Sequence, residues 1–379
     1  MTFAKTDIAL PTMSSGTQRT LTVFRYGSEN ARPKAYLHTA LHADENPGIL
    51  VMHHLMALLN DADKKDEIKG EITLVPVANP IGLSQHIFGS LQGRFEFSSS
   101  QNFNRNYPDI AQQVVASVEK EFGDDATANI DLIRWAMHVA LDEFQPNDEL
   151  GFLRRTFLRL AVDSDICLDL HCDWDAVLHV YTTPTLWPDA SDLCAQLGSE
   201  TTLLAEVSGG HPFDEAVGGV WQALAQRYPH YSIPAACLSA TVELRGETDV
   251  SDESAKQDAK NLFRFLQRRK IITGDPGPLP QCKCEATPLT GVDTVKAPVP
   301  GVVVYHKQPG DYVEQGETVA TIVNPLNADA GAARTDVKSR TNGVVYARRS
   351  DRFTRPGQTL CRIAGKTPLP DRTGNLLSD

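Results

Sequence analysis

Short apolar runs alternate with longer amphipathic stretches through the first two-thirds of the 379-residue chain, and this alternation constrains the fold most strongly. Apolar runs with the character of β-strands lie at residues 35–41, 71–78, 165–170, 176–182 and 238–244. Segments with helical periodicity lie at residues 47–62, 126–160, 191–207 and 252–270. Strands that alternate with helices predict an α/β fold, in which a mixed, mostly parallel sheet is flanked by helices on both faces.

The composition changes after a proline-rich stretch, and the last part of the chain carries an internal repeat. Residues 271–290 hold four prolines and precede a segment rich in valine and glycine. In that segment residues 301–303 are repeated at 343–345, and residues 316–319 are echoed at 357–360. Two similar halves of short strands and glycine turns predict a small all-β domain, a two-fold sandwich or flattened barrel.

These patterns divide the chain into four expected segments. We expect an α/β domain over residues 1–275, a linker over 276–291, a β-domain over 292–366 and a loose tail over 367–379. Within the first domain, the glycine pairs at 209–210 and 218–219 predict mobile loops.

Charge and composition argue against several classes of protein. The formal net charge of −12 makes nucleic acid a poor partner. No apolar run approaches the length of about 18 residues that a membrane span needs, so we expect no membrane association. The N-terminal residues do not resemble a secretory signal, and the seven scattered cysteines suit reduced thiols. We therefore expect a cytoplasmic protein.

Two histidines and one glutamate form the strongest candidate metal site. His42 and Glu45 form an H-x-x-E motif between a predicted strand and a predicted helix, where α/β sheets place their sites. His171 ends a later apolar strand and can complete a set of two imidazoles and one carboxylate. Such a set leaves one zinc position open for water. Taken singly, the H-x-x-E motif is a weak signal, and a buried, hydrogen-bonded histidine is the default interpretation of His171.

Further candidates for binding and catalysis lie on a polar loop and on the last predicted strand. Arg105, beside Asn104, suits a carboxylate because a guanidinium pairs with it in a fork, and Arg94 adds a positive charge upstream. Glu243 ends a β-rich run, where a carboxylate can transfer protons near a metal. For the polar loop, the alternative is a surface turn capped by asparagine side chains. For Glu243, the alternative is a salt-bridged residue at the edge of the sheet.

These four signals, in this order, resemble the succinylglutamate desuccinylase/aspartoacylase branch of the zinc carboxypeptidase-like superfamily. The family pattern is an H-x-x-E motif, an Asn-Arg pair, a later strand-end histidine and a T-V-E-like strand. Here these are residues 42–45, 104–105, His171 and 241–243. The resemblance spans about residues 35–270. It implies one zinc ion per chain and hydrolysis of an N-acyl amino acid or a similar acyl amide.

The resemblance also implies individual roles. His42, Glu45 and His171 would be the zinc ligands, and Glu243 the general base and later the general acid. The substrate carboxylate would lie on Asn104 and Arg105. Arg94 is the candidate for polarising the scissile carbonyl. Family members that take acidic substrates often carry another arginine before the catalytic strand. Residues 232–240 have none, and Arg245 is the candidate substitute.

The C-terminal repeat resembles biotinyl/lipoyl-type β-domains, which carry their cofactor on a lysine at a hairpin tip. The corresponding stretch, residues 324–336, has no lysine, while Lys296 and Lys338 lie near strand starts. We therefore expect a β-domain without a carrier lysine that acts as a lid or assembly module.

The sequence leaves two other functions open. One is a metallocarboxypeptidase that acts on a peptide C-terminus with the same site. The other is a non-catalytic zinc-binding or assembly module. The expected partner is a small anionic substrate of the N-acyl amino acid type, and homo-oligomerisation is left open.

Overall fold

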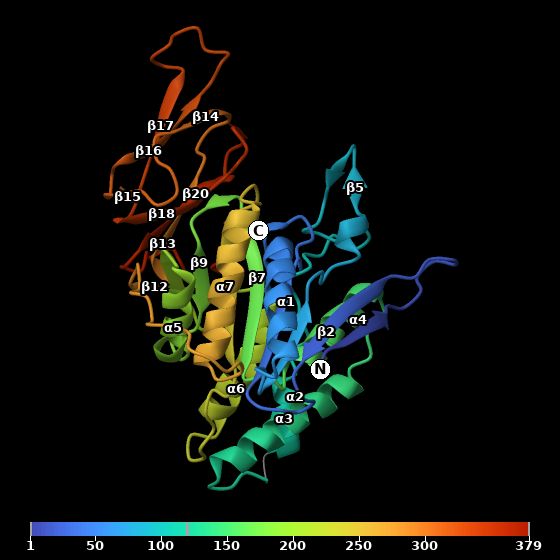
Figure 1. The fold of residues 1–379 in the computed structure, drawn as a ribbon. Helices are drawn as coiled ribbons and strands as arrows, with labels where there is room; N and C mark the ends of the chain where they lie inside the picture. Colours follow the sequence, from blue (N-terminus) through green and yellow to red (C-terminus); the bar gives the residue numbers. More distant parts are fainter. Residues whose placement is uncertain (1, 119–120, 378–379) are drawn as a thin grey trace.

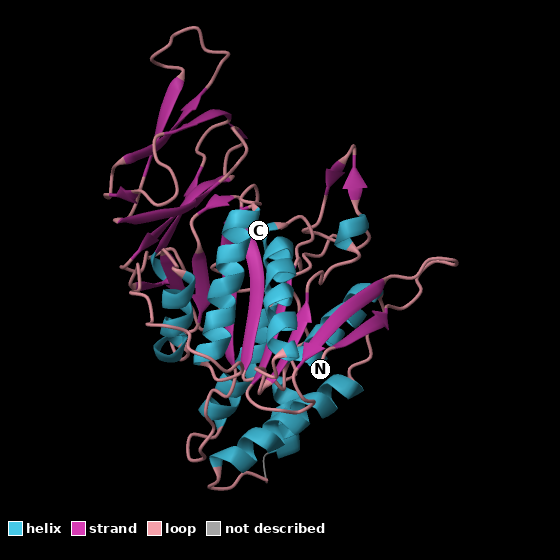
Figure 2. Ribbon diagram, viewed as in Figure 1, coloured by secondary structure: helices cyan, strands magenta, loops and turns pink. Residues whose placement is uncertain are grey.

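The structure is a computed structural model that describes residues 2–118 and 121–377. Residue 1 and residues 119–120 of the predicted α/β domain, and residues 378–379 of the predicted tail, lie outside the described residues. The described chain forms an α/β part and, above it in the view of Figure 1, a part made only of strands and loops (Figure 2). In the described part of the chain, none of the helices combines the length and apolar character of a bilayer span.

A mixed sheet forms the centre of the α/β part. Its strands follow the spatial order β1 (Ala4–Ala9), β2 (Thr20–Tyr26), β4 (Glu71–Val75), β3 (Lys34–Thr39), β7 (Ile166–Asp173), β11 (Leu238–Gly246), β9 (His179–Thr182), β10 (Thr201–Leu204) and β12 (Ala286–Pro288). The central strands β4, β3, β7 and β11 are parallel to one another, while β9 is antiparallel to β11. This arrangement confirms the predicted fold class.

Helices cover both faces of this sheet. One face packs against α1 (Pro47–Lys64), α5 (Trp187–Leu197) and α7 (Asp252–Arg268). The other face packs against α2 (Ala111–Val118), α3 (Ala126–Glu143), α4 (Glu149–Ala161) and α6 (Phe213–Arg227). A short hairpin of β5 (His86–Ile87) and β6 (Ser90–Leu91) follows the one-turn helix η1 (Gly82–Ser84) and stands apart from the sheet (Figure 1).

The alternation of side chains along the central strands decides which residues reach the site. In β7, Leu168 and Leu170 join the apolar core under α1 and α7. Asp169 and His171 alternate with them and therefore point to the opposite face, under α6. In β11, Val242 belongs to the first face and Glu243 to the second in the same way. Polar residues spaced by two are thus gathered on one face of a buried sheet.

The structure corrects the prediction of one helix over residues 191–207. Helix α5 ends at Leu197 because Gly198 adopts a left-handed conformation, with φ of 75°, that caps the helix. The chain then forms β10, which pairs in parallel with β9. The glycines at 218–219 are part of α6, so the mobile loop predicted for them is also wrong.

The C-terminal part consists of two small antiparallel sheets. The first half of the repeat supplies β13 (Val292–Lys296), β14 (Gly301–Tyr305), β15 (Tyr312–Val313) and β16 (Thr318–Val323). The second half supplies β17 (Arg334–Lys338), β18 (Gly343–Arg348), β19 (Phe353–Thr354) and β20 (Thr359–Gly365) in the same order. The sheets have the orders β13-β20-β18-β15 and β17-β16-β14-β19, so each takes strands from both halves. The likeness of this β-unit (residues 292–365) to biotinyl/lipoyl domains stays a prediction.

The C-terminal residues are joined to the α/β part by strand pairing and by backbone hydrogen bonds. Strand β8 (Asp175–Ala176), which follows β7, pairs with β18. Within the predicted linker, β12 adds to the edge of the large sheet next to β10, and the one-turn helix η2 (Leu289–Gly291) follows it. In the predicted tail, the backbone N–H groups of Leu376 and Leu377 donate to the Ser208 carbonyl. These contacts hold the β-unit and the described end of the tail against the α/β part.

Candidate metal centre and active-site cavity

The H-x-x-E motif lies in the turn between β3 and α1. Ala40 has a positive φ of 59°, which turns the chain out of the strand, and the Glu45 N–H donates to the His42 carbonyl. Both side chains are buried, with exposed fractions of 3% for His42 and 8% for Glu45. The turn is braced by a neighbouring loop, because the Ala43 N–H donates to the Gly93 carbonyl at 3.0 Å.

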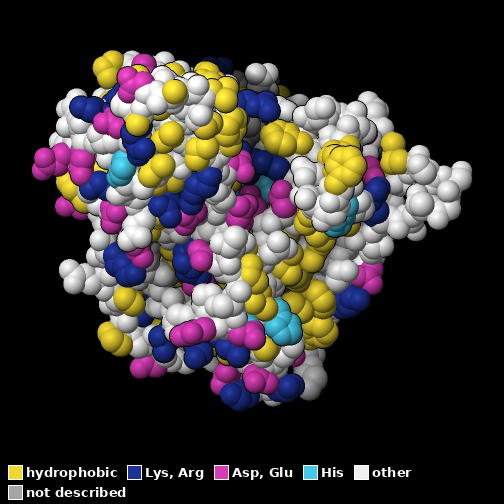
Figure 3. All heavy atoms as spheres, turned by 90° about the horizontal axis from the view of Figure 1, so that it is seen from above, with side chains coloured by type: hydrophobic (Ala, Val, Ile, Leu, Met, Phe, Trp, Pro, Cys, Tyr) yellow, Lys and Arg dark blue, Asp and Glu magenta, His cyan; other side chains and the backbone are white. Residues whose placement is uncertain are grey.

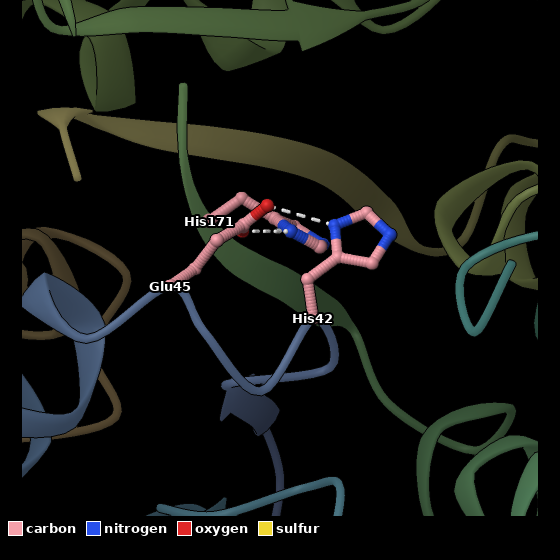
Figure 4. Close-up of side chains that lie close together, drawn as sticks. All are labelled: His42, Glu45 and His171. Atoms are coloured by element: carbon pink, nitrogen blue, oxygen red, sulfur yellow. Dashed lines mark hydrogen bonds and ion pairs between the residues drawn. The ribbon is translucent and has the colours of Figure 1, made fainter. Parts of the chain in front are cut away.

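The structure brings the three predicted metal ligands together. His42, Glu45 and His171 each offer a ligand atom, and these atoms all lie within 4.8 Å of one another. Glu45 lies between the imidazoles: its Oε1 is 2.8 Å from His42 Nδ1, and its Oε2 is 2.6 Å from His171 Nδ1 (Figure 4). Two imidazoles and one carboxylate converge on one point, as a divalent ion requires.

Hydrogen bonds on the far side of each imidazole fix which nitrogen faces the centre. His42 Nε2 lies 2.9 Å from Asn102 Oδ1, and His171 Nε2 lies 2.9 Å from Asp169 Oδ1. Both partners are acceptors for an Nε2–H donor, so each Nδ1, which faces Glu45, is the nitrogen available to a metal ion. The donor set therefore fits a zinc ion, with the Nδ1 atoms as ligands.

Electrostatics favour the ligand forms of His42 and Glu45. Burial, then the Arg94 guanidinium, lowers the pKa of His42, which favours the neutral imidazole. Burial alone raises the pKa of Glu45, but the adjacent imidazoles of His42 and His171 outweigh burial and lower it. Glu45 is therefore an ionised carboxylate at neutral pH.

A buried polar chain supports His171 from behind. Asp169 Oδ1 also lies 2.7 Å from His38 Nε2, and the Tyr36 hydroxyl lies 2.9 Å from His38 Nδ1. His38 and Asp169 have exposed fractions of 0%. Sequence reasoning missed the contribution of Tyr36 to this chain of polar contacts. These contacts restrict how the His171 ring can rotate.

We expect Gly93→Ala to weaken zinc binding by roughly tenfold, because overpacking at a tight backbone contact costs about 1–3 kcal/mol. A Cβ on Gly93 would lie 2.1 Å from the backbone nitrogen of Asp44, inside the H-x-x-E turn. Competitive zinc titration measures the effect. Gly123→Ala is the control, since a Cβ there meets no heavy atom within 4 Å. Equal affinities in the two variants would show that the turn does not depend on this contact.

Glu243 lies beside the metal ligands. The strand register pairs it directly with His171 of β7 and with His179 of β9. Its Oε2 is buried and has no hydrogen-bond partner among the described residues. Burial raises the pKa of Glu243 to about 8, with further raising by Glu45. A carboxyl group with such a pKa exchanges protons near neutral pH.

Arg94, the candidate for polarising the scissile carbonyl, and Asn104, a predicted substrate-binding residue, lie near the same centre. Arg94 Nη1 is 3.2 Å from Glu45 Oε1. Asn104 is held on both sides of its amide: its Nδ2 donates to Asp169 and its Oδ1 accepts from the N–H of Phe213. Asn104 therefore links the support of His171 to the start of α6.

Arg105 lines the cavity beside Asn104 and also meets the end of the described chain. Its Nη1 donates to the Asn104 carbonyl at 2.7 Å, and its Nη2 donates to the Leu377 carbonyl at 3.3 Å. A Cβ on Gly210 would lie 2.5 Å from Arg105 Cδ, so glycine is needed there for the Arg105 side chain to pass.

The structure does not bring Arg245 to the centre. The pairing of β11 with β7 is irregular between Glu243 and Gly246, and Arg245 has a positive φ of 66°. This twist breaks the strand alternation and directs the guanidinium to Asp258 of α7. Arg245 is not among the described residues that line the cavity.

A cavity of about 400 Å³ extends from the metal ligands between β11 and α6. Seen from above, charged and histidine side chains surround a hollow between the β-unit and the β5–β6 side (Figure 3). Cavity-lining residues that sequence reasoning missed include Thr182, Glu206, Asp214, Glu215, Trp221, Gln222 and Arg362. No local motif marks them, because they come from separate elements that only the fold assembles.

Comparisons with known proteins agree with this geometry. Residues 31–133 match the model of the succinylglutamate desuccinylase/aspartoacylase catalytic domain, which confirms the family resemblance drawn from the motifs. The match includes the H-x-x-E motif and the Asn-Arg pair. Comparison with curated protein sequences gives no match.

Solved structures show that the fold is shared over nearly the whole chain. A putative succinylglutamate desuccinylase/aspartoacylase family protein from Shewanella amazonensis is 22% identical, with a TM-score of 0.84, covering 96% of this chain and 99% of its own. A putative succinylglutamate desuccinylase/aspartoacylase from Shewanella frigidimarina is also 22% identical, with a TM-score of 0.83 and coverage of 97% and 99%. The product-bound ectoine utilization protein EutE (DoeB) from Ruegeria pomeroyi is 16% identical, with a TM-score of 0.68 and coverage of 96% and 95%.

Proposed function

We propose that this chain is a zinc-dependent deacylase, with one zinc ion per chain, that hydrolyses the amide bond of an N-acyl amino acid or a related acyl amide. The observation that carries the proposal is the convergence of His42, Glu45 and His171, with Glu243 directly beside His171. The match of residues 31–133 to a deacylase catalytic domain supports the same reaction class.

A zinc ion held by the three ligands would activate the water, and a side chain of the protein transfers the protons. When bound by His42, Glu45 and His171, zinc would acidify a water molecule and polarise a carbonyl group. Glu243 accepts the proton of the attacking water at its unpartnered Oε2 and later donates a proton to the leaving amine. The pKa of about 8 allows the group to serve in both protonation states near neutral pH.

The arginines of the polar loop would orient the substrate. Arg94 lies against Glu45 at the edge of the metal centre, where its guanidinium stabilises negative charge that develops on the scissile carbonyl oxygen. Arg105, on the cavity wall, offers its guanidinium to a substrate carboxylate. The backbone carbonyl of Asn104 accepts a hydrogen bond from Arg105 Nη1 and so helps to orient the guanidinium.

Two alternatives share parts of this site. A metallocarboxypeptidase would use the same ligands and base on a peptide C-terminus. A zinc-binding assembly module would bind the ion without turnover. The buried Oε2 of Glu243, which has no hydrogen-bond partner among the described residues, favours a catalytic role over the second alternative, because a buried polar atom without a partner costs stability.

A substrate panel separates these alternatives. We expect zinc-loaded protein to hydrolyse at least one of the N-acetyl, N-succinyl and N-formyl amino acids, faster than it hydrolyses dipeptides with a free α-amino group. Amine release measures turnover, and the chelator-treated protein is the control. Faster release from dipeptides would favour the carboxypeptidase, while no chelator-sensitive release from any compound would favour the assembly module.

A further inference from the structure

One arginine of the C-terminal β-unit reaches the active-site cavity. Arg362 lies on β20, between β13 and β18 in the sheet that β8 extends through its pairing with β18. Its side chain lines the same cavity as His42, His171 and Glu243, although 191 positions separate it from His171 along the chain. The β-unit therefore contributes part of the wall of the cavity.

The Arg362 guanidinium is held in a fixed orientation. Its Nη1 donates to Asp173 Oδ2 at 2.7 Å, and Asp173 follows His171 by two residues on β7. The guanidinium carbon lies 4.8 Å from the centroid of the Trp174 ring, and Arg349 lies at the same distance from that ring. A guanidinium that is clamped before a ligand arrives loses little entropy on binding.

Part of this guanidinium remains available to a ligand. The bond from Nη1 to Asp173 is the one side-chain hydrogen bond that Arg362 makes within residues 2–118 and 121–377, and 17% of the side chain is exposed. Its other N–H donors are thus left unused by the described protein groups. Burial lowers the pKa of Arg362, but Asp173, the two nearby tyrosines and Glu243 raise it overall, so the group stays charged.

We propose that Arg362 binds a carboxylate of the substrate, so that the β-unit determines specificity in the active site. This inference rests on the proposed deacylase function. A planar guanidinium with one edge anchored and the other open suits a carboxylate, which accepts two parallel N–H bonds. Arg245, which follows Glu243 by two residues, faces α7 instead. Arg362 brings a positive charge to this cavity from another part of the chain.

The carboxylate can belong to either half of the substrate. It is on the amine half in an N-acetyl amino acid, and on the acyl half in an N-succinyl alkylamine. Each compound has a carboxamide counterpart that keeps the shape and removes the charge. Comparing each carboxylate with its carboxamide assigns Arg362 to one half.

The test uses Arg362→Met in the full-length, zinc-loaded chain, with Arg348→Met as the matched control. Arg348 also joins the β-unit to the α/β part, through Asp175 at 2.6 Å, but does not line the cavity. Loss of a charged hydrogen bond predicts a KM roughly 10- to 100-fold higher for one carboxylate substrate in Arg362→Met. The KM of its carboxamide counterpart and the kcat should change much less, and Arg348→Met should leave both KM values near wild type.

Calorimetric binding of the same compounds provides a second readout that needs no turnover. We expect Arg362→Met to weaken binding of the carboxylate and not of the carboxamide, with zinc content and Tm close to those of Arg348→Met. Equal losses for carboxylate and carboxamide, or no loss in either, would overturn the proposal. Wild-type protein that binds the carboxylate through Arg362 but hydrolyses no amide would instead contradict the deacylase function alone.

Discussion

Glu243→Gln is expected to lower kcat by roughly two to four orders of magnitude while zinc remains bound. Glu243 is the half-buried carboxyl group beside His171, and its buried Oε2 has no hydrogen-bond partner among the described residues. Glutamine keeps the size and the polarity of the side chain but cannot accept the proton of water. The change therefore removes proton transfer without opening a cavity.

Steady-state kinetics and zinc content should be measured on the same preparation of Glu243→Gln. Glu247→Gln is the control, because Glu247 is an exposed carboxylate just beyond the same strand, bonded to the Ser350 hydroxyl. We expect the control to match wild type in both measurements. Turnover within a few-fold of wild type in Glu243→Gln would remove this residue from the chemistry.

His171→Ala is expected to weaken zinc binding by more than about 100-fold and to abolish zinc-dependent turnover. Mutation of a residue that only hydrogen-bonds to a metal ligand lowers metal affinity by about 10- to 100-fold, so removal of a ligand itself should lower it further. The substitution also leaves Asp169 and Glu45 without the imidazole that lies between them. Two buried carboxylates would then face each other less well compensated.

Zinc titration and circular dichroism separate metal loss from unfolding in this variant. His53→Ala is the control, because His53 is an exposed histidine on α1 that follows the same motif. The control should bind zinc like wild type. Retention of full zinc affinity by a folded His171→Ala protein would show that the ion is held elsewhere.

The grouping of the three candidate metal ligands could be predicted from the sequence because each has a local signature. His42 and Glu45 lie three positions apart in one turn, and His171 stands on an apolar strand that was recognisable by composition. Parallel neighbouring strands end at the same edge of a sheet, so topology brings the turn and the strand together. Glu243 could be predicted for the same reason, since β11 is the next strand beside β7.

Other features depend on geometry that no local pattern records. Arg245 was expected near the substrate, but a positive φ and an irregular strand pairing direct it to Asp258. Strand β10 lies within the segment that was predicted as one helix. The prediction missed the left-handed backbone conformation of Gly198, which ends α5. Arg362 enters the cavity only through the packing of the β-unit on the strand that follows His171.

Anomalous diffraction at the zinc absorption edge, on crystals of zinc-loaded wild-type protein, tests the central claim most directly. The proposed function predicts one strong peak per chain, about 2 Å from His42 Nδ1, His171 Nδ1 and a carboxylate oxygen of Glu45. A peak at other residues, such as the Cys282 and Cys284 thiols, or no peak between the two imidazoles, would contradict it.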